Sequence, residues 1–212
     1  MTELVIVGAS GLGREFAELV EDINVDHHTY HLLGFLDDDP SLPGTEVNGL
    51  PVLGGTSWLA HHLNVSAAIA VGNTKVRLKI AGRMGVSGIA TPVLCHPTAV
   101  IGRTSVIGYG SIVCAGTVIT TNAVLGRHVV VNYGSTIGHD AVLHDFVTLA
   151  PGVHVSGHVT LEEGVDMGTG STIIQGRSVG KFTVVGAGAA VVRDLPAGVT
   201  AVGVPARPLE RK

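Results

Sequence analysis

An aliphatic residue returns at every sixth position along the second half of the chain. From Ile101 to Val191 this period holds without a slip. A helix repeats every 3.6 residues and a strand every 2, so neither explains a period of six. The period is typical of a β-solenoid, in which each hexad forms one flat side of a coil. Three sides close a coil, so residues eighteen positions apart should stack. The periodic residues are Ile101, Ile107, Val113, Ile119, Leu125, Val131, Ile137, Leu143, Leu149, Val155, Leu161, Met167, Ile173, Val179, Val185 and Val191.

The other positions of the hexad support this interpretation. Four residues after each periodic position the side chain is mostly small or β-branched, as a narrow prism requires. Three residues after it, Gly, Asn or Asp is common, and a corner with positive φ favours these residues. A glycine-rich β-barrel is the alternative, but a barrel has no reason to hold one register over so long a stretch. Examples of the corner position are Gly110, Gly116, Asn122, Gly134, Asp140 and Gly152.

The first ninety or so residues lack the six-residue period. They instead alternate short apolar runs with amphipathic segments, which predicts a small parallel α/β domain. The expected strands are Leu4–Val7, Leu33–Leu36 and Ala67–Val71, and the expected helices are Arg14–Asp22 and Lys75–Met84. We therefore expect an α/β domain over residues 1–92, a parallel β-helix over 93–195 and a tail without repeats over 196–212.

Composition and charge exclude several classes of function. The chain has 212 residues, 45% of them hydrophobic but only 4% aromatic, which suits a thin solenoid filled with Val, Ile and Ala. The net charge is −4 and there is no basic cluster outside Arg207, Arg211 and Lys212, so nucleic-acid binding has little support. No signal peptide or long apolar run is visible, so we expect a cytoplasmic protein without a membrane partner. Two cysteines without a CxxC motif do not form a disulfide framework.

A glycine-rich loop joins the first expected strand to the first expected helix. The sequence Gly8-Ala9-Ser10-Gly11-Leu12-Gly13 suits a phosphate site, because glycines admit the ligand and the helix N-terminus offers free N–H groups. Its spacing differs from the usual dinucleotide motif, and a turn without a ligand is the alternative. Asp37 and Asp38 end the neighbouring strand, where carboxylates would accept hydrogen bonds from ribose, sugar or base. The alternative for these two is a solvated turn.

His139 differs from the other histidines of the repeats. It lies two residues after a periodic position, at an expected corner, and Asp140 follows it directly. A nearby carboxylate fixes the imidazole tautomer and raises its basicity, as a general base requires. Gly157 lies eighteen residues further on, so it should stack about 4.8 Å away and leave a slot with an exposed N–H for an oxyanion. An ordinary corner histidine is the alternative.

The chain resembles a known family over almost its whole length. The segments GASGLGRE, FLDD, CHPTAVIG, NYGSTIGHD and GVPAR together are similar to the sialic-acid O-acetyltransferase and bacterial nucleotide-sugar N-acetyltransferase family. This resemblance implies that the β-helix is left-handed and forms a homotrimer. It also implies that the N-terminal domain binds the nucleotide-sugar substrate and that acetyl-CoA lies between neighbouring solenoids, with no metal.

The resemblance also implies roles for individual residues. His139 resembles the catalytic base, Asp140 its acidic partner and Gly157 the residue whose N–H meets the acetyl carbonyl. Asn132 resembles a supporting residue of the site. The nucleotide-sugar loop corresponds to Ser10, Gly11, Leu12, Gly13, Asp37 and Asp38. Contacts with CoA are expected from Gly157, Thr148, Ala187, Val204 and Pro205. Thr148 stands where some members of the family have a second histidine that contacts CoA.

Three alternative functions stay open at this point. O-acetylation of sialic acid or a related sugar is one, although a nucleotide-binding domain favours an activated amino sugar and therefore N-acetylation. A γ-class carbonic anhydrase is another, because His139 and His144 have the spacing of its zinc ligands. Its third ligand would fall at Arg103, which does not bind zinc. A non-catalytic trimeric scaffold is the last. The nucleotide base, the sugar and the acetylated carbon are not set by these motifs.

Overall fold

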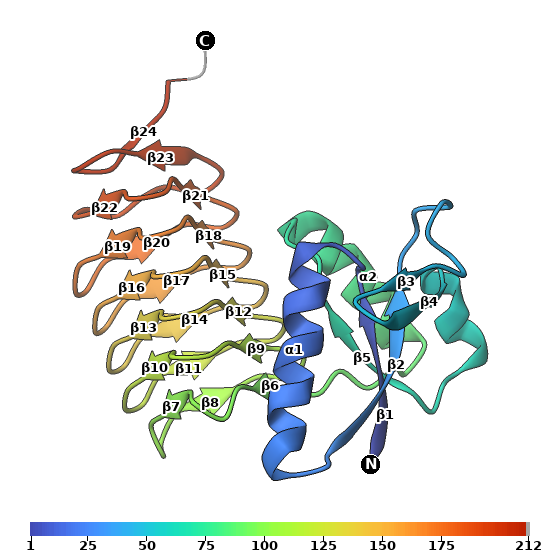
Figure 1. Ribbon diagram of the computed structural model, residues 1–212. Coiled ribbons are helices and arrows are strands. Elements are labelled where there is room, and N and C mark those ends of the chain that lie inside the picture. The colour runs from blue at the N-terminus through green and yellow to red at the C-terminus, as the bar shows by residue number, and fades with distance from the viewer. Residues whose placement is uncertain (211–212) are drawn as a thin grey trace. The chain divides into compact units, whose positions relative to one another are not determined.

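The computed structural model describes residues 1–210, so Arg211 and Lys212, the end of the expected tail, lie outside the described residues. It contains two compact units, Met1–Pro97 and a second that begins at Thr98 (Figure 1). The division falls a few residues after the boundary expected at residue 92. No helix in the described part of the chain combines the length and apolar character needed to cross a membrane.

The first unit is an α/β domain, as predicted. Its five-stranded sheet has the order β3-β4-β2-β1-β5, with β1 parallel to β2 and β5, β4 parallel to β2 and β3 antiparallel to β4. The strands are β1 (Thr2–Val7), β2 (Tyr30–Leu36), β3 (Glu46–Val47), β4 (Leu50–Gly54) and β5 (Ser66–Ile69), followed by the short β6 (Leu94–Cys95). The helices are α1 (Gly11–Asp26), the 3₁₀ helix η1 (Thr56–His61) and α2 (Thr74–Val86).

Burial explains why these elements form where they do. The apolar run of β1 is buried, and helix α1 turns Phe16, Leu19 and Val20 inward, each at most 3% exposed. Helix α1 begins at Gly11, three residues before its predicted start. The β3–β4 hairpin was not predicted, although its Asn48-Gly49 turn, with φ of 50° and 77°, carries a strong hairpin signal.

The second unit is a parallel β-helix built from the six-residue period. Each strand from β7 to β22 ends on one of the periodic aliphatic residues, which confirms the predicted repeat. The strands are β7 (Val100–Ile101), β8 (Val106–Ile107), β9 (Ile112–Val113), β10 (Val118–Ile119), β11 (Val124–Leu125), β12 (Val130–Val131), β13 (Thr136–Ile137), β14 (Val142–Leu143), β15 (Thr148–Leu149), β16 (His154–Val155), β17 (Thr160–Leu161), β18 (Asp166–Met167), β19 (Thr172–Ile173), β20 (Ser178–Val179), β21 (Val184–Val185) and β22 (Ala190–Val191).

Residues eighteen apart stack on three faces of the coil. The first face has the strand order β7-β10-β13-β16-β19-β22, the second β8-β11-β14-β17-β20, and the third includes β9-β12-β15-β18-β21. Pairing is in register, so that Ile119 lies beside Ile137 and Ile137 beside Val155. This is the left-handed parallel β-helix expected for the chain (Figure 1).

The corners take the predicted conformation. The glycines of the corner position, and Asn122 and Asp140 with φ of 58° and 57°, adopt the left-handed region. Four larger residues at the same position do so as well, which was not expected. They are His128, Phe146, His158 and Phe182.

The expected tail is more regular than predicted. Strand β23 (Thr200–Val202) pairs in parallel with β21, and β24 (Arg207–Pro208) pairs antiparallel with β23, so both extend the third face. Val184 pairs with Thr200, an offset of 16 residues where the coils use 18. The shortened turn breaks the sequence period while the backbone pairing continues.

Candidate active site

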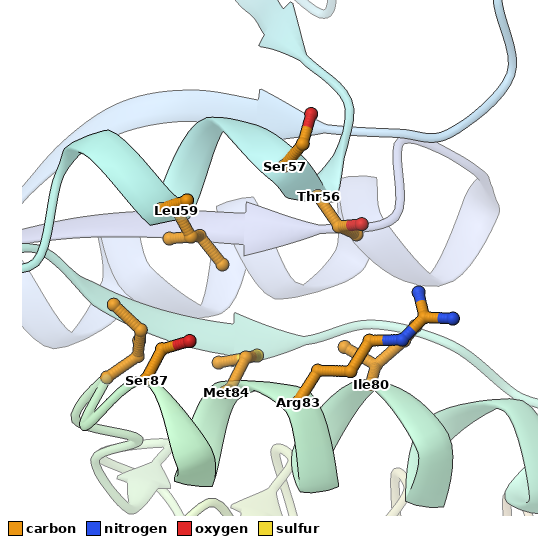
Figure 2. Close-up of a pocket in the computed structure, with 9 residues that line it drawn as sticks. Thr56, Ser57, Leu59, Ile80, Arg83, Met84 and Ser87 are labelled. Carbon is orange, nitrogen blue, oxygen red and sulfur yellow. The ribbon is translucent and has the colours of Figure 1, made fainter.

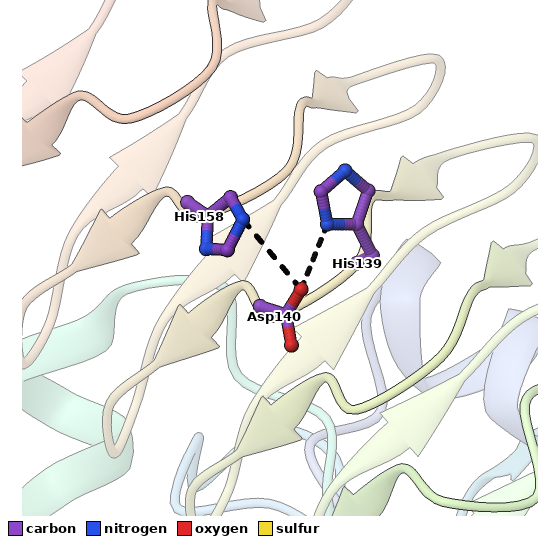
Figure 3. Close-up of side chains that lie close together, drawn as sticks. All are labelled: His139, Asp140 and His158. Carbon is purple, nitrogen blue, oxygen red and sulfur yellow. Dashed lines mark hydrogen bonds and ion pairs between the residues drawn. The ribbon is translucent and has the colours of Figure 1, made fainter.

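His139 lies at the corner that follows strand β13, on the first face of the coil. Its Nδ1 is 2.8 Å from Oδ2 of Asp140, and the two side chains are 48% and 38% exposed (Figure 3). Because Asp140 takes a left-handed backbone conformation, the chain turns sharply between the two residues. The pair is therefore held at an accessible edge of the solenoid.

The surroundings of Asp140 keep it ionised. Hydrogen bonds from the side chains of His139 and Asn122 lower the pKa of the Asp140 carboxyl. The Asn122 amide, one coil earlier, donates to Oδ1 at 3.1 Å. An ionised carboxylate beside Nδ1 makes that nitrogen the donor, so Nε2 of the neutral imidazole is the nitrogen that can accept a proton.

Gly157 stacks directly against the His139 imidazole. A Cβ atom at residue 157 would lie 2.5 Å from His139 Nε2, so only glycine leaves room for the ring in this position. Within residues 1–210, the Gly157 N–H makes no hydrogen bond to a backbone or side-chain acceptor. The structure thus brings together His139, Asp140 and Gly157, with an available N–H beside a ring nitrogen.

A second imidazole approaches the same carboxylate. His158 Nε2 lies 3.7 Å from Asp140 Oδ2, and its ring meets that of His139 edge to face at 4.9 Å between centroids. Sequence reasoning missed the contacts of Asn122 and His158 with Asp140. The signal was their eighteen-residue spacing at the corner position, which places all three in one column.

The glycine loop of the first unit is tied to the end of strand β2. Asp37 Oδ2 accepts a hydrogen bond from the Ala9 N–H at 2.9 Å. Ser10 precedes helix α1 and its side chain makes no capping bond. Gly11, Leu12 and Gly13 form the first turn of that helix, whose N–H groups have no acceptor within the helix. The predicted loop therefore presents the free N–H groups of a helix N-terminus, which an anion site requires, and Asp37 lies next to them.

Asp38 accepts hydrogen bonds from Thr56, at the start of η1. Its Oδ1 and Oδ2 accept from the Thr56 N–H at 2.7 Å and the Thr56 hydroxyl at 3.1 Å. Thr56 also lines a pocket of about 290 Å³ between η1 and α2, which sequence reasoning did not find (Figure 2). The pocket is mostly apolar, and Arg83 extends its guanidinium towards the Thr56 end.

Four of the five residues expected to contact CoA are associated with strands of the third face, and the fifth, Gly157, follows β16 of the first. Thr148 begins β15, Ala187 follows β21, and Val204 and Pro205 follow β23. Asn132 lies at the end of β12, where its side-chain amide donates to the Leu149 carbonyl at 2.8 Å and is buried. His139 belongs to the first face, so one chain does not place these residues around a single corner.

The two histidines with the spacing of carbonic anhydrase zinc ligands lie at different corners of the coil. His144 lies at a different corner from His139, in a polar pocket with Arg127, Asp145 and Glu162. In the described part of the chain, the histidines and carboxylates spaced to hold a metal ion are His139, Asp140 and His158. His139 and His144, the pair on which the carbonic anhydrase alternative rested, are not grouped within residues 1–210.

Comparison with known proteins identifies the family. Residues 3–84 match the model of the PglD N-terminal domain. The chain is 33% identical to GDP-perosamine N-acetyltransferase of Escherichia coli O157:H7, over 97% of this chain and 96% of that protein.

Solved structures with the same fold extend the comparison. One is a histidine mutant of perosamine N-acetyltransferase from Caulobacter crescentus in complex with CoA and GDP-perosamine (29% identity, TM-score 0.91, 100% of this chain and 98% of that one). Another is the acetyltransferase domain of PglB from Neisseria gonorrhoeae FA1090 in complex with acetyl coenzyme A (38% identity, TM-score 0.89, 98% of both chains). The chain belongs to the family of bacterial nucleotide-sugar N-acetyltransferases with hexapeptide repeats.

Proposed function

We propose that this protein transfers the acetyl group of acetyl-CoA to the amino group of a nucleotide-linked 4-amino-deoxy sugar. The observation that carries the proposal is the His139 imidazole, with Nδ1 bound to Asp140 and Nε2 facing Gly157. Relatives named as GDP-perosamine and UDP-N-acetylbacillosamine N-acetyltransferases support this chemistry.

In the proposed reaction His139 acts as general base. The sugar amine attacks the thioester carbonyl while Nε2 takes a proton from the nitrogen, and Asp140 stabilises the imidazolium that forms. The Gly157 N–H donates to the oxyanion of the tetrahedral intermediate. Collapse of the intermediate breaks the C–S bond, and the departing CoA thiolate recovers the proton from His139.

The properties of the two cysteines support direct transfer of the acetyl group, without an acyl-enzyme. Cys114 is buried, and burial raises the pKa of the Cys95 thiol to about 11. A thiol needs its thiolate form to act as a nucleophile. Neither residue lies at the His139 corner, so no acyl-enzyme is part of the proposal.

In this proposal the first unit binds the nucleotide part of the substrate. The free amides of Ser10, Gly11, Leu12 and Gly13 are suited to the diphosphate. Asp37 and Asp38 each retain lone pairs beyond their internal hydrogen bonds, and these would accept from ribose or base. A substrate without a nucleotide would lack these contacts.

A homotrimer would complete the site. The expected CoA-binding residues Thr148, Ala187, Val204 and Pro205 lie on the third face, and His139 at a corner of the first. A neighbouring chain can bring its third face to that corner, with Asn132 supporting the shared seam and acetyl-CoA between the chains. We expect the assembly to act in the cytoplasm.

Release of free thiol from acetyl-CoA tests the proposal. Purified protein is mixed with acetyl-CoA and either GDP-perosamine, a UDP-linked 4-amino sugar or sialic acid. Thiol release with a nucleotide-linked amino sugar, and a product heavier by one acetyl group, are expected. Release with sialic acid alone would instead identify an O-acetyltransferase, and no release with any sugar would favour a scaffold.

A further inference from the structure

Three side chains at the His139 corner offer converging donor atoms. They come from His139, Asp140 and His158, one ligand atom from each lying within 4.8 Å of the others, and Asp140 Oδ2 faces both His139 Nδ1 and His158 Nε2 (Figure 3). Two imidazoles and a carboxylate are ligands that zinc binds in sites with three protein ligands and one open position. The proposed reaction uses Nε2 of His139 and gives no role to His158.

The two distances from Asp140 Oδ2 lie on either side of the spacing expected around a tetrahedral ion. Zinc–ligand distances of about 2.0–2.1 Å place neighbouring ligand atoms of a tetrahedron about 3.3 Å apart. Asp140 Oδ2 is 2.8 Å from His139 Nδ1 and 3.7 Å from His158 Nε2, one shorter and one longer than this value. The His139, Asp140 and His158 side chains are 48%, 38% and 56% exposed, so small rotations can equalise the distances.

The backbone and a neighbouring amide hold the ligands in place. The His158 N–H donates to the His139 carbonyl at 2.9 Å, which fixes the two coils relative to each other. Asn122 donates to Asp140 Oδ1, so Oδ2 is the oxygen left facing the imidazoles. Such outer hydrogen bonds orient metal ligands and strengthen binding.

We propose that His139, Asp140 and His158 form a reversible Zn²⁺ site that inhibits the enzyme. The inhibitory part rests on the proposed function, but binding of the ion does not. Coordination through Nδ1 displaces the proton that this nitrogen donates to Asp140. The neutral ring then carries its proton on Nε2, taken from solvent as the Nδ1 proton is released. A protonated Nε2 cannot accept a proton from the sugar amine, so the base is blocked.

Competition with a chromogenic zinc chelator tests binding without any acetyl transfer. The full chain, stripped of metal and free of a histidine tag, should withdraw one zinc ion per chain from the chelator. His158→Gln removes one ligand and should weaken this binding at least about tenfold. His144→Gln, at an exposed histidine outside the cluster, is the matched control and should bind like the parent. Absence of zinc binding by the parent, or equal binding by His158→Gln, would overturn the site.

Thiol-release assays then test inhibition. With a chelator present, the rate of each variant without zinc serves as its own reference. Added Zn²⁺ should inhibit the parent at concentrations at least about tenfold lower than those that inhibit His158→Gln. Zinc binding without any acetyl transfer in the chelated protein would refute the proposed function and leave the site intact. If bound zinc does not slow acetyl transfer, the inhibitory role is refuted.

Discussion

At the scale of single residues, the His139 imidazole is held by contacts from its own coil and from the coils on either side. Asp140 binds its Nδ1, Asn122 from the preceding coil orients that carboxylate, and Gly157 from the following coil leaves space beside Nε2. Each contact uses a corner or a stacked position of the repeat. The orientation of the His139 imidazole is therefore a property of the solenoid backbone and not of a mobile loop.

Replacing His139 by alanine tests its role as base. The His139→Ala variant should lower kcat by about 10²–10⁴-fold, the usual contribution of a positioned base, and leave acetyl-CoA affinity largely unchanged. Steady-state thiol release and calorimetric titration of acetyl-CoA measure the two quantities. Turnover equal to that of the parent would show that the base lies elsewhere.

Gly157 can be tested by adding a single methyl group. The Gly157→Ala variant places Cβ 2.5 Å from His139 Nε2, so the ring must move. A displacement of about 1 Å can cost about 10²-fold in rate, and we expect kcat to fall by that order with little change in melting temperature. Gln175→Ala, one coil further along the same corner, is the control and should keep its activity. A fully active Gly157→Ala would remove this glycine from the site.

At the scale of elements, the six-residue period predicted every strand of the solenoid from β7 to β22. It did so because each strand must bury one aliphatic residue in a narrow core. The period did not predict that larger residues would occupy some corners. Ring packing between coils offsets the cost of their left-handed backbone conformation, and a sequence period does not show such packing. The His128 and Phe146 rings stack at 5.1 Å between centroids, and the Phe182 ring occupies the space that a side chain at Gly164 would need.

The candidate site was only partly visible in the sequence for a similar reason. The eighteen-residue spacing placed Gly157 beside His139, since stacking depends on the backbone alone. The contacts of Asn122 and His158 with Asp140 depend on side-chain rotamers, which a period does not specify. The pocket at η1 was missed because it needs the packing of two helices that lack a repeat.

A corner glycine offers a test at the same scale. Gly170 has φ of 65°, and a Cβ there would meet no atom within 4 Å, so backbone strain alone decides the effect. Gly170→Ala should destabilise the protein by about 1–2 kcal/mol, and Gly170→Asn by less, because asparagine tolerates this region. Chemical denaturation measures both. Equal stability of the alanine variant and the parent would contradict a strained corner.

At the scale of the whole molecule, the division of predicted site residues between two faces predicts an assembly. Sedimentation should give three times the 21.7 kDa mass of one chain. Co-expressing His139→Ala with an inactive Ala187→Trp variant should restore activity to about one quarter of the sites in random trimers, because each active site would draw on two chains. Each variant alone should be inactive. No recovery in the mixture would indicate that each site lies within one chain.

The uniform stacking of coils sets the distance that acetyl-CoA would have to span along the solenoid. Each coil advances the chain by about 4.8 Å, so the number of coils sets the axial separation between His139 and the segment at Val204 and Pro205. Inserting a second copy of residues 159–176 after Gly176 should lengthen that separation by one step and leave the His139–Gly157 pair unchanged. We expect a raised KM for acetyl-CoA with unaltered nucleotide-sugar binding, which would make the solenoid a molecular ruler for its cosubstrate. An unchanged KM would mean that CoA does not reach the C-terminal segment.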